Sequence, residues 1–160
     1  MIQITLPDGS VREYEAGVSA LDVAKSISEG LARKVLAAEL NGEVIDAFRP
    51  INNNASLKLL TWDDKGGKST FWHSSAHLMA EAIEDIFPGT KFGIGPAIET
   101  GFYYDIDLGD RKMEEEDLAK IEKKFKELAS KKEQYKRSEV SKADAIKYLQ
   151  RKMTSTSWNL

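Results

Sequence analysis

The two histidines of this chain, His73 and His77, are the residues whose type and spacing could best carry chemistry. They lie four residues apart in a segment with a helical pattern, so both imidazoles would leave the same face one turn apart. A neutral imidazole accepts a proton near pH 7. The apolar residues of this segment cluster on the opposite face, namely Phe71, Leu78, Ala82 and Ile86, with Met79 and Ile83 at its margin. A histidine kept for packing would lie on that apolar face, so the pair is a candidate site.

The spacing of the pair leaves several interpretations open. Zinc peptidases share it, but their signature has a glutamate directly after the first histidine as general base. Ser74 takes that position here, which argues against a peptidase. Glu84 lies seven residues after His77 on the same face, so a small metal hydrolase built on these three residues is an alternative. The histidines could also be surface residues without a function.

Composition excludes several classes of protein. A length of 160 residues allows one ordinary domain or two small ones, and 41% hydrophobic and 31% charged residues are globular values. The absence of cysteine excludes disulfides, cysteine-based zinc sites and a thiol nucleophile within this sequence. No apolar run approaches the roughly 20 residues that span a bilayer, and the N-terminus lacks the pattern of a signal peptide. We therefore expect a cytoplasmic protein without membrane contacts.

The charge pattern bears on nucleic-acid binding. The net charge is −3, so a contact with nucleic acid would need a local basic patch. The densest basic run lies within residues 120–137, but acidic residues balance it over nearly the same window. This pattern favours a solvated helix face with ion pairs over an RNA contact.

Residues 1–62 have the pattern of a compact mixed unit. Apolar and polar residues alternate over residues 2–6, and a turn at 7–10 leads into a return strand at 11–14. This pattern predicts a hairpin. Ser19 and Asp22 predict a capping box for a helix over residues 20–28, which Gly30 would end. The predicted buried stripe of that helix is Leu21, Ala24 and Ile27. Strands at 35–40, 43–45 and 56–61 would complete a four- or five-stranded sheet with one packed helix.

Residues 63–160 are predicted to form a second region. Residues 63–69 have the polarity and glycine content of a linker, and the histidine helix follows over residues 70–87. We expect a glycine-punctuated segment at 91–96, a strand at 100–107 and a helix over 114–131 whose apolar stripe is Leu118, Ile121, Phe125 and Leu128. A strand at 135–140 and a capped helix from Ser141 follow. We expect residues 149–160 to be a disordered tail.

The first region resembles the TGS module, a small β-grasp domain of the ubiquitin-like class. The residues that carry the resemblance are ITLPDGS, SALDVAKSIS and AAELNGEVID leading into LKLLT. TGS modules occur in threonyl-tRNA synthetases, in stringent-response nucleotide synthetases and in some GTP-binding proteins. The resemblance therefore implies a fold and leaves the function open.

The second region resembles the opening of the editing domain of threonyl-tRNA synthetases, over HSSAHLMAEAIEDIFPGTKFGIGPAIETGFYYDID. This resemblance implies that His73 and His77 are catalytic residues that activate water or hold the terminal ribose of the tRNA. It also implies that Tyr104, Gly95 and Pro96 contribute to substrate binding. The expected fold class is α+β, with a TGS domain at 1–62, a linker at 63–69 and an incomplete editing domain at 70–148.

The family resemblance implies further properties of a longer protein. That protein would be a class II threonine–tRNA ligase whose partner is the acceptor end of threonine tRNA. It would use ATP, magnesium and a zinc ion in a catalytic domain outside this sequence. It would be a homodimer through other domains. The family completes its editing site with a Cys-x-x-x-His motif that this sequence lacks, so we expect an inactive N-terminal fragment without metal or cofactor that can self-associate. The alternative is a stand-alone TGS module that binds RNA or protein.

Overall fold

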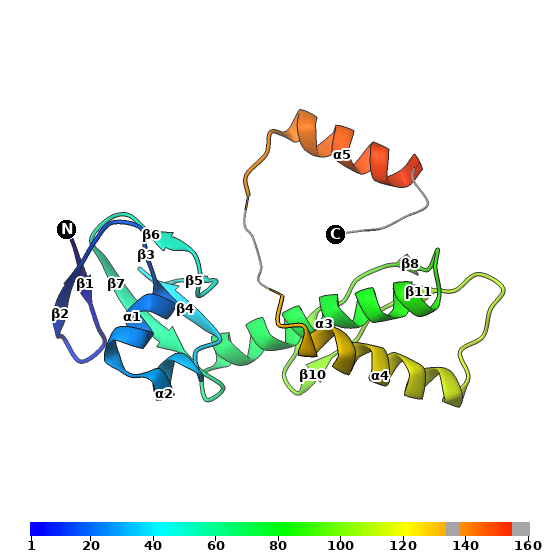
Figure 1. Cartoon of the computed structure of the whole chain (residues 1–160), viewed down its shortest axis with the longest axis horizontal. Coiled ribbons are helices and arrows are strands. Elements are labelled where there is room, and N and C mark those ends of the chain that lie inside the picture. Colours follow the sequence, from blue (N-terminus) through cyan, green and yellow to red (C-terminus); the bar gives the residue numbers. More distant parts are fainter. Residues whose placement is uncertain (134–137, 155–160) are drawn as a thin grey trace.

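The N-terminal half is a mixed five-stranded sheet with a helix packed on it (Figure 1). The computed structural model describes residues 1–133 and 138–154, with side chains as far as Gln150. The strand order is β2-β1-β7-β4-β5, in which only the β1 and β7 pair is parallel. The strands of this sheet are β1 (Ile2–Thr5), β2 (Val11–Tyr14), β4 (Ala37–Leu40), β5 (Glu43–Ile45) and β7 (Ala55–Leu60). This is the predicted β-grasp arrangement.

The core of this half lies between the sheet and α1 (Ala20–Ile27). Ile2 and Ile4 are buried while the residues between and after them are exposed, so β1 alternates as predicted. A short ladder that the sequence analysis missed, β3 (Val18–Ser19) with β6 (Pro50–Ile51), lies beside α1. The buried residues of the core are Ile2, Ile4, Ala20, Val23, Ala38, Ile45, Ile51 and Leu57.

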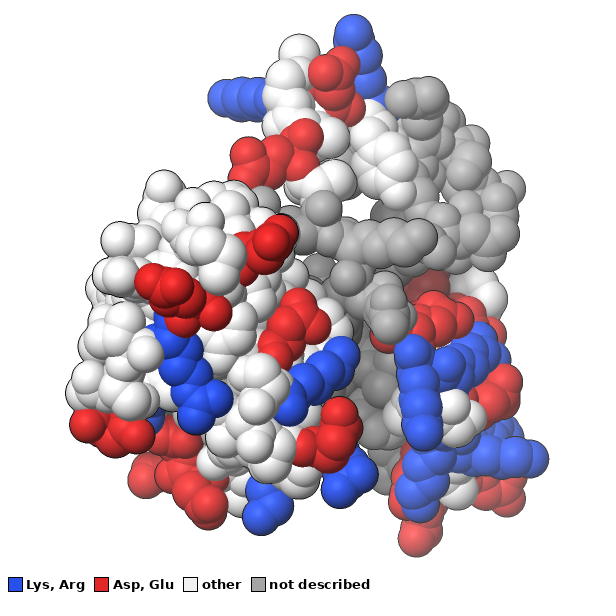
Figure 2. All heavy atoms as spheres, turned by 60° about the vertical axis from the view of Figure 1, so that its left-hand side comes forward, with Lys and Arg blue, Asp and Glu red and all other residues white. Residues whose placement is uncertain are grey.

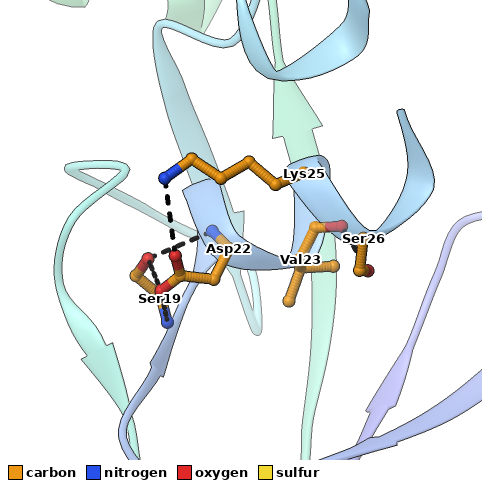
Figure 3. A network of polar contacts seen from close by, with 5 residues as sticks. All are labelled: Ser19, Asp22, Val23, Lys25 and Ser26. Carbon is orange, nitrogen blue, oxygen red and sulfur yellow. Dashed lines mark hydrogen bonds and ion pairs between the residues drawn. The ribbon is translucent and has the colours of Figure 1, made fainter. Parts of the chain in front are cut away.

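The capping box of α1 is confirmed (Figure 3). The Asp22 amide donates to Ser19 Oγ at 3.2 Å, and the Asp22 carboxylate accepts from the Ser19 amide at 3.2 Å and from its hydroxyl at 2.6 Å. The hydroxyl of Ser19 is the main reason that the pKa of Asp22 lies below its ordinary value. Beyond the box, Lys25 lies 3.8 Å from the same carboxylate, and the Ser26 hydroxyl donates to the Val23 carbonyl at 2.7 Å.

Two predictions about this helix are wrong. The predicted stripe is right for Ala24 and wrong for Ile27, which is 37% exposed, while Leu21 is partly buried; Ala20 and Val23 complete the buried face. Gly30 does not end the helix. Ser28, in an extended conformation, ends α1 and caps the short helix α2 (Glu29–Ala32), which contains Gly30.

The predicted linker at 63–69 is also wrong, because helix α3 (Lys65–Ile86) begins at Lys65. Asp64 is its N-cap residue, and the Asp64 carboxylate accepts from the Thr61 amide at 3.0 Å. Lys58 of β7 pairs with that carboxylate at 2.8 Å, which holds the pKa of Asp64 below its ordinary value. The glycines that suggested a flexible linker lie inside the first turn of this helix, where the helix packs closely on the end of the sheet.

Helix α4 (Glu115–Ser130) packs beside α3 around a small second core. Its buried residues are Ala82 and Ile83 from α3 and Ile121 and Leu128 from α4, with Phe125 partly buried against them. Leu118, which the periodicity placed in the stripe, is 55% exposed. Phe71, which the pattern placed on the apolar face of α3, is likewise 41% exposed, whereas Gly67, Ala76, Ala82 and Ile83 are buried.

Four very short strands lie between α3 and α4. β8 (Lys91–Phe92) pairs with β11 (Ile106–Asp107), and β9 (Ala97–Ile98) pairs with β10 (Gly101–Phe102). The single strand expected at 100–107 is therefore wrong, because residues 103–105 separate two strands with different partners.

The last helix is α5 (Lys142–Thr154). The Asp144 amide donates to Ser141 Oγ at 3.1 Å, which confirms the predicted cap. The expected disorder is wrong for residues 149–154, which continue the helix because nothing from Lys142 to Thr154 is proline or glycine. Residues 155–160 lie outside the described residues. Residues 138–140 form no strand, and the rest of the strand expected at 135–140 also lies outside the described residues.

Candidate functional site

His73 and His77 lie side by side on the exposed surface of α3. Their Nε2 atoms are 3.1 Å apart, and their ring centroids are 4.7 Å apart with the ring planes nearly perpendicular. This confirms the predicted geometry of two imidazoles one turn apart. At this distance one ring donates a hydrogen bond and the other accepts it, so a neutral pair holds one proton between the two Nε2 atoms.

The environment of His77 favours its neutral imidazole. Burial lowers the pKa of His77 from its ordinary value of 6.5, and the nearby His73 lowers it further. A neutral imidazole is the form that can take a proton from water near pH 7. His77 therefore has the chemistry of a weak base at the protein surface.

We expect His77 to titrate below pH 6.5 in the folded chain. Because its folded pKa is depressed, its contribution to stability is present above 6.5 and is lost as the pH falls through the folded pKa. Replacing His73 by alanine should raise the pKa of His77, since the second cause of the shift is removed. NMR of the imidazole Cε1–Hε1 signals measures both values directly, because the chain has two histidines. A pKa of His77 at or above 6.5 in the wild type would contradict this.

Tyr104 packs on Gly95 in the segment between α3 and α4. A Cβ atom added to Gly95 would lie 2.5 Å from two carbons of the Tyr104 ring, so the ring occupies the space that a side chain at Gly95 would need. The ring also contacts Phe92 at a centroid distance of 5.5 Å. Of the two adjacent tyrosines, Tyr104 is the packed one and Tyr103 is 46% exposed.

Backbone hydrogen bonds hold the loop around Gly95 in place. The Gly93 amide donates to the Asp105 carbonyl at 2.8 Å, and the Asp105 amide donates to the Ile94 carbonyl at 3.0 Å. Pro96 follows Gly95 directly and is partly buried just before β9. Tyr104, Gly95 and Pro96 thus belong to one local unit.

The sequence-predicted site residues therefore form two groups on neighbouring elements. The histidines lie on α3, and Tyr104, Gly95 and Pro96 lie on the loop unit whose strands β9 and β10 pack against α3. Trp72, next to His73 in the sequence, contacts Phe102 of β10 at a centroid distance of 6.1 Å. Sequence reasoning missed this aromatic contact, although the aromatic residues around His73 were a signal for it.

Glu84 does not join the histidine pair. Its carboxylate accepts from the Gly89 amide at 3.2 Å, at the turn after the helix. A separation of seven residues is also about 10 Å along a helix, which is too long for ligands of one metal ion. Among the side chains that the structure describes, no cluster of three or more histidine, aspartate or glutamate residues could hold a metal ion. The small metal hydrolase lacks its third ligand.

Comparison with known proteins gives the first region its family. Residues 2–61 match the model of the TGS domain. These residues form a TGS domain. The predicted resemblance is confirmed for this part of the chain, and the β-grasp sheet described above is its fold.

The similarity continues well beyond the TGS domain. The chain is 64% identical over 148 residues to a threonine–tRNA ligase of Cytophaga hutchinsonii, 60% identical over 147 residues to one of Parabacteroides distasonis and 56% identical over 147 residues to one of Bacteroides fragilis. Each alignment covers 92% of this chain and 23% of the relative. The chain is thus similar to part of these ligases over nearly all its length, as the sequence analysis predicted.

Proposed function

We propose that this chain serves as the N-terminal region of a threonine–tRNA ligase, with the TGS domain followed by the first part of an editing domain. The observation that carries the proposal is the 64% identity over 148 residues. An identity that extends so far past residues 2–61 favours this function over a stand-alone TGS module.

Editing has a physical motive in such an enzyme. A pocket for threonine cannot strongly reject serine, which keeps the hydroxyl and lacks one methyl group worth about 1–3 kcal/mol. A second site that hydrolyses the wrong ester restores accuracy. We assign to this site the exposed pair His73 and His77, whose imidazoles can position water or the terminal ribose and, in the neutral form, accept a proton. Tyr104, Gly95 and Pro96 would shape the substrate pocket.

The remaining properties follow from the same proposal. The partner is the acceptor end of threonine tRNA, and ATP, magnesium and zinc would be bound by other parts of a dimeric, cytoplasmic ligase. On the face shown in Figure 2, basic side chains lie among acidic ones. Along α4, Lys120, Lys124 and Lys126 are each paired with a carboxylate, which supports a solvated surface there. No helix within the described residues is long and apolar enough to cross a bilayer.

The test is hydrolysis of serine-charged threonine tRNA by a full-length ligase that contains this region. We expect His73→Ala and His77→Ala to slow hydrolysis about 10²- to 10⁴-fold, the usual contribution of a positioned acid or base. Charging with threonine should stay unchanged. Ser75→Ala is the matched control, since the Ser75 hydroxyl donates to the Phe71 carbonyl on the same helix. Hydrolysis at the control rate in both histidine variants would remove the proposed role.

A further inference from the structure

Four aromatic rings connect the TGS domain to the candidate site. Trp62 follows the last strand of the TGS sheet, and its ring centroid lies 5.3 Å from that of Phe71 and 5.4 Å from that of Trp72. Phe71 and Trp72 also contact each other at 5.4 Å. Trp72 in turn contacts Phe102 of β10. We call Trp62, Phe71, Trp72 and Phe102 the aromatic bridge.

The aromatic bridge contains close sequence neighbours of both groups of site residues. Trp72 directly precedes His73 on α3, so a rotation of the helix that moves Trp72 also moves the histidine. Phe102 lies two residues before Tyr104, whose ring packs on Gly95. The bridge therefore joins the histidine helix to the loop unit, and Trp62 is the one member that belongs to the TGS side of the junction.

The Trp62 ring is 45% exposed, and the backbone on its C-terminal side is held by hydrogen bonds. The Thr61 carbonyl accepts from the Asp64 amide at 3.1 Å, and the Asp64 carbonyl accepts from the Lys68 amide at 3.0 Å. The ammonium of Lys68 lies 5.9 Å from the centre of the Trp62 ring, within reach of a cation–π contact. Edge-to-face ring pairs at these distances contribute about 0.5–1.5 kcal/mol each beyond their buried area. Such contacts fix the direction in which α3 leaves the sheet.

We infer that Trp62 is a positioning residue, through which the TGS domain holds α3 and its histidines in register with the loop that carries Tyr104. The inference rests on the proposed editing function, and it adds to the editing site a positioning residue that directly follows the TGS domain. Trp62 acts through Phe71 and Trp72 and touches no reacting group.

The test compares Trp62→Leu, which keeps apolar bulk, with Trp62→Phe, which keeps an aromatic ring. Phe48→Ala is the matched control, because Phe48 is a half-exposed aromatic residue of the TGS domain outside the bridge. The first readout is the NMR position of the His73 and His77 ring signals in the 160-residue chain, without tRNA. We expect Trp62→Leu to move both signals and Trp62→Phe to restore them, with Phe48→Ala at the wild-type positions.

The second readout is hydrolysis of serine-charged tRNA by the full-length ligase. Trp62→Leu should lower kcat about 10- to 100-fold with little change in KM, because misplacement of the reacting groups affects the chemical step. Wild-type histidine signals in Trp62→Leu would overturn the inference. So would loss of the β1 and β7 amide signals in that variant, since Trp62 would then be a core residue of the TGS domain. The NMR readout needs no activity, so it stands even if the histidine variants disprove editing.

Discussion

Gly67→Ala is expected to destabilise the protein by about 3 kcal/mol, although alanine is the better helix former by about 1 kcal/mol. A Cβ atom at Gly67 would lie 2.0 Å from the Thr61 carbonyl oxygen and 2.8 Å from its carbonyl carbon. These are backbone atoms, and Thr61 is held by its amide and its carbonyl to Asp64. Relief of the clash therefore has to break those bonds or tilt α3 away from the sheet.

Two other glycines provide matched controls for this substitution. At Gly66 the added atom would meet the ends of the Leu60 and Val44 side chains at 2.9 Å and 3.4 Å, which can rotate away, so a smaller loss is expected. At Gly30, inside α2, the nearest atom is 3.9 Å away, so alanine should be neutral or slightly stabilising. Urea unfolding measures all three. A loss at Gly67 no larger than the value at Gly30 would contradict the close approach.

These glycines illustrate why the start of helix α3 at Lys65 could not be predicted. In a sequence, two adjacent glycines lower the helix propensity and suggest a flexible segment. The reason for their presence is a tertiary contact with Thr61, Leu60 and Val44, which no local pattern reveals. The capping box at Ser19 was predictable for the opposite reason, because both of its residues lie within one turn.

The candidate site also has one part that the local sequence predicts and one part that depends on tertiary contacts. The geometry of His73 and His77 follows from helical spacing alone, and the structure confirms it. The contact between Gly95 and Tyr104 depends on how a loop folds back between two short strand pairs. The strong strand pattern of residues 100–107 concealed this fold, because aromatic and β-branched residues favour strands whichever partner they find. The role of Trp62 depends on two domains meeting and could not be predicted from either one.

Helix α4 shows a limit of periodicity. Its spacing of apolar residues places Leu118 and Leu128 on one stripe, but the two differ in burial, with 55% and 6% of their surfaces exposed. Periodicity defines which face of a helix is apolar. How much of that face is buried depends on the element that packs on it, which is α3 for this helix. Here Ile83 and Ala82 of α3 pack with Ile121 and Leu128, and Leu118 lies outside that buried cluster.

Leu128→Ala is accordingly expected to cost about 2–4 kcal/mol, and Leu118→Ala less than about 0.5 kcal/mol. The two variants delete the same atoms from the same helix, so the difference reports burial. Because Leu128 belongs to the core between α3 and α4, Leu128→Ala should lower the stability of these two helices more than that of the TGS domain. Hydrogen exchange of the α3 and α4 amides, with urea unfolding of the whole chain, measures this.

The result at Leu118 also tests self-association. If the exposed end of the α4 stripe contacts a second copy in solution, Leu118→Ala will destabilise the chain at high concentration and not at low concentration, because association stabilises by mass action. A loss at Leu118 equal to that at Leu128 and independent of concentration would show that the α4 stripe is buried along its whole length. Leu118 would then be buried in solution, contrary to its 55% exposed surface in the structure. The stripe predicted from the periodicity of the sequence would be correct along its whole length.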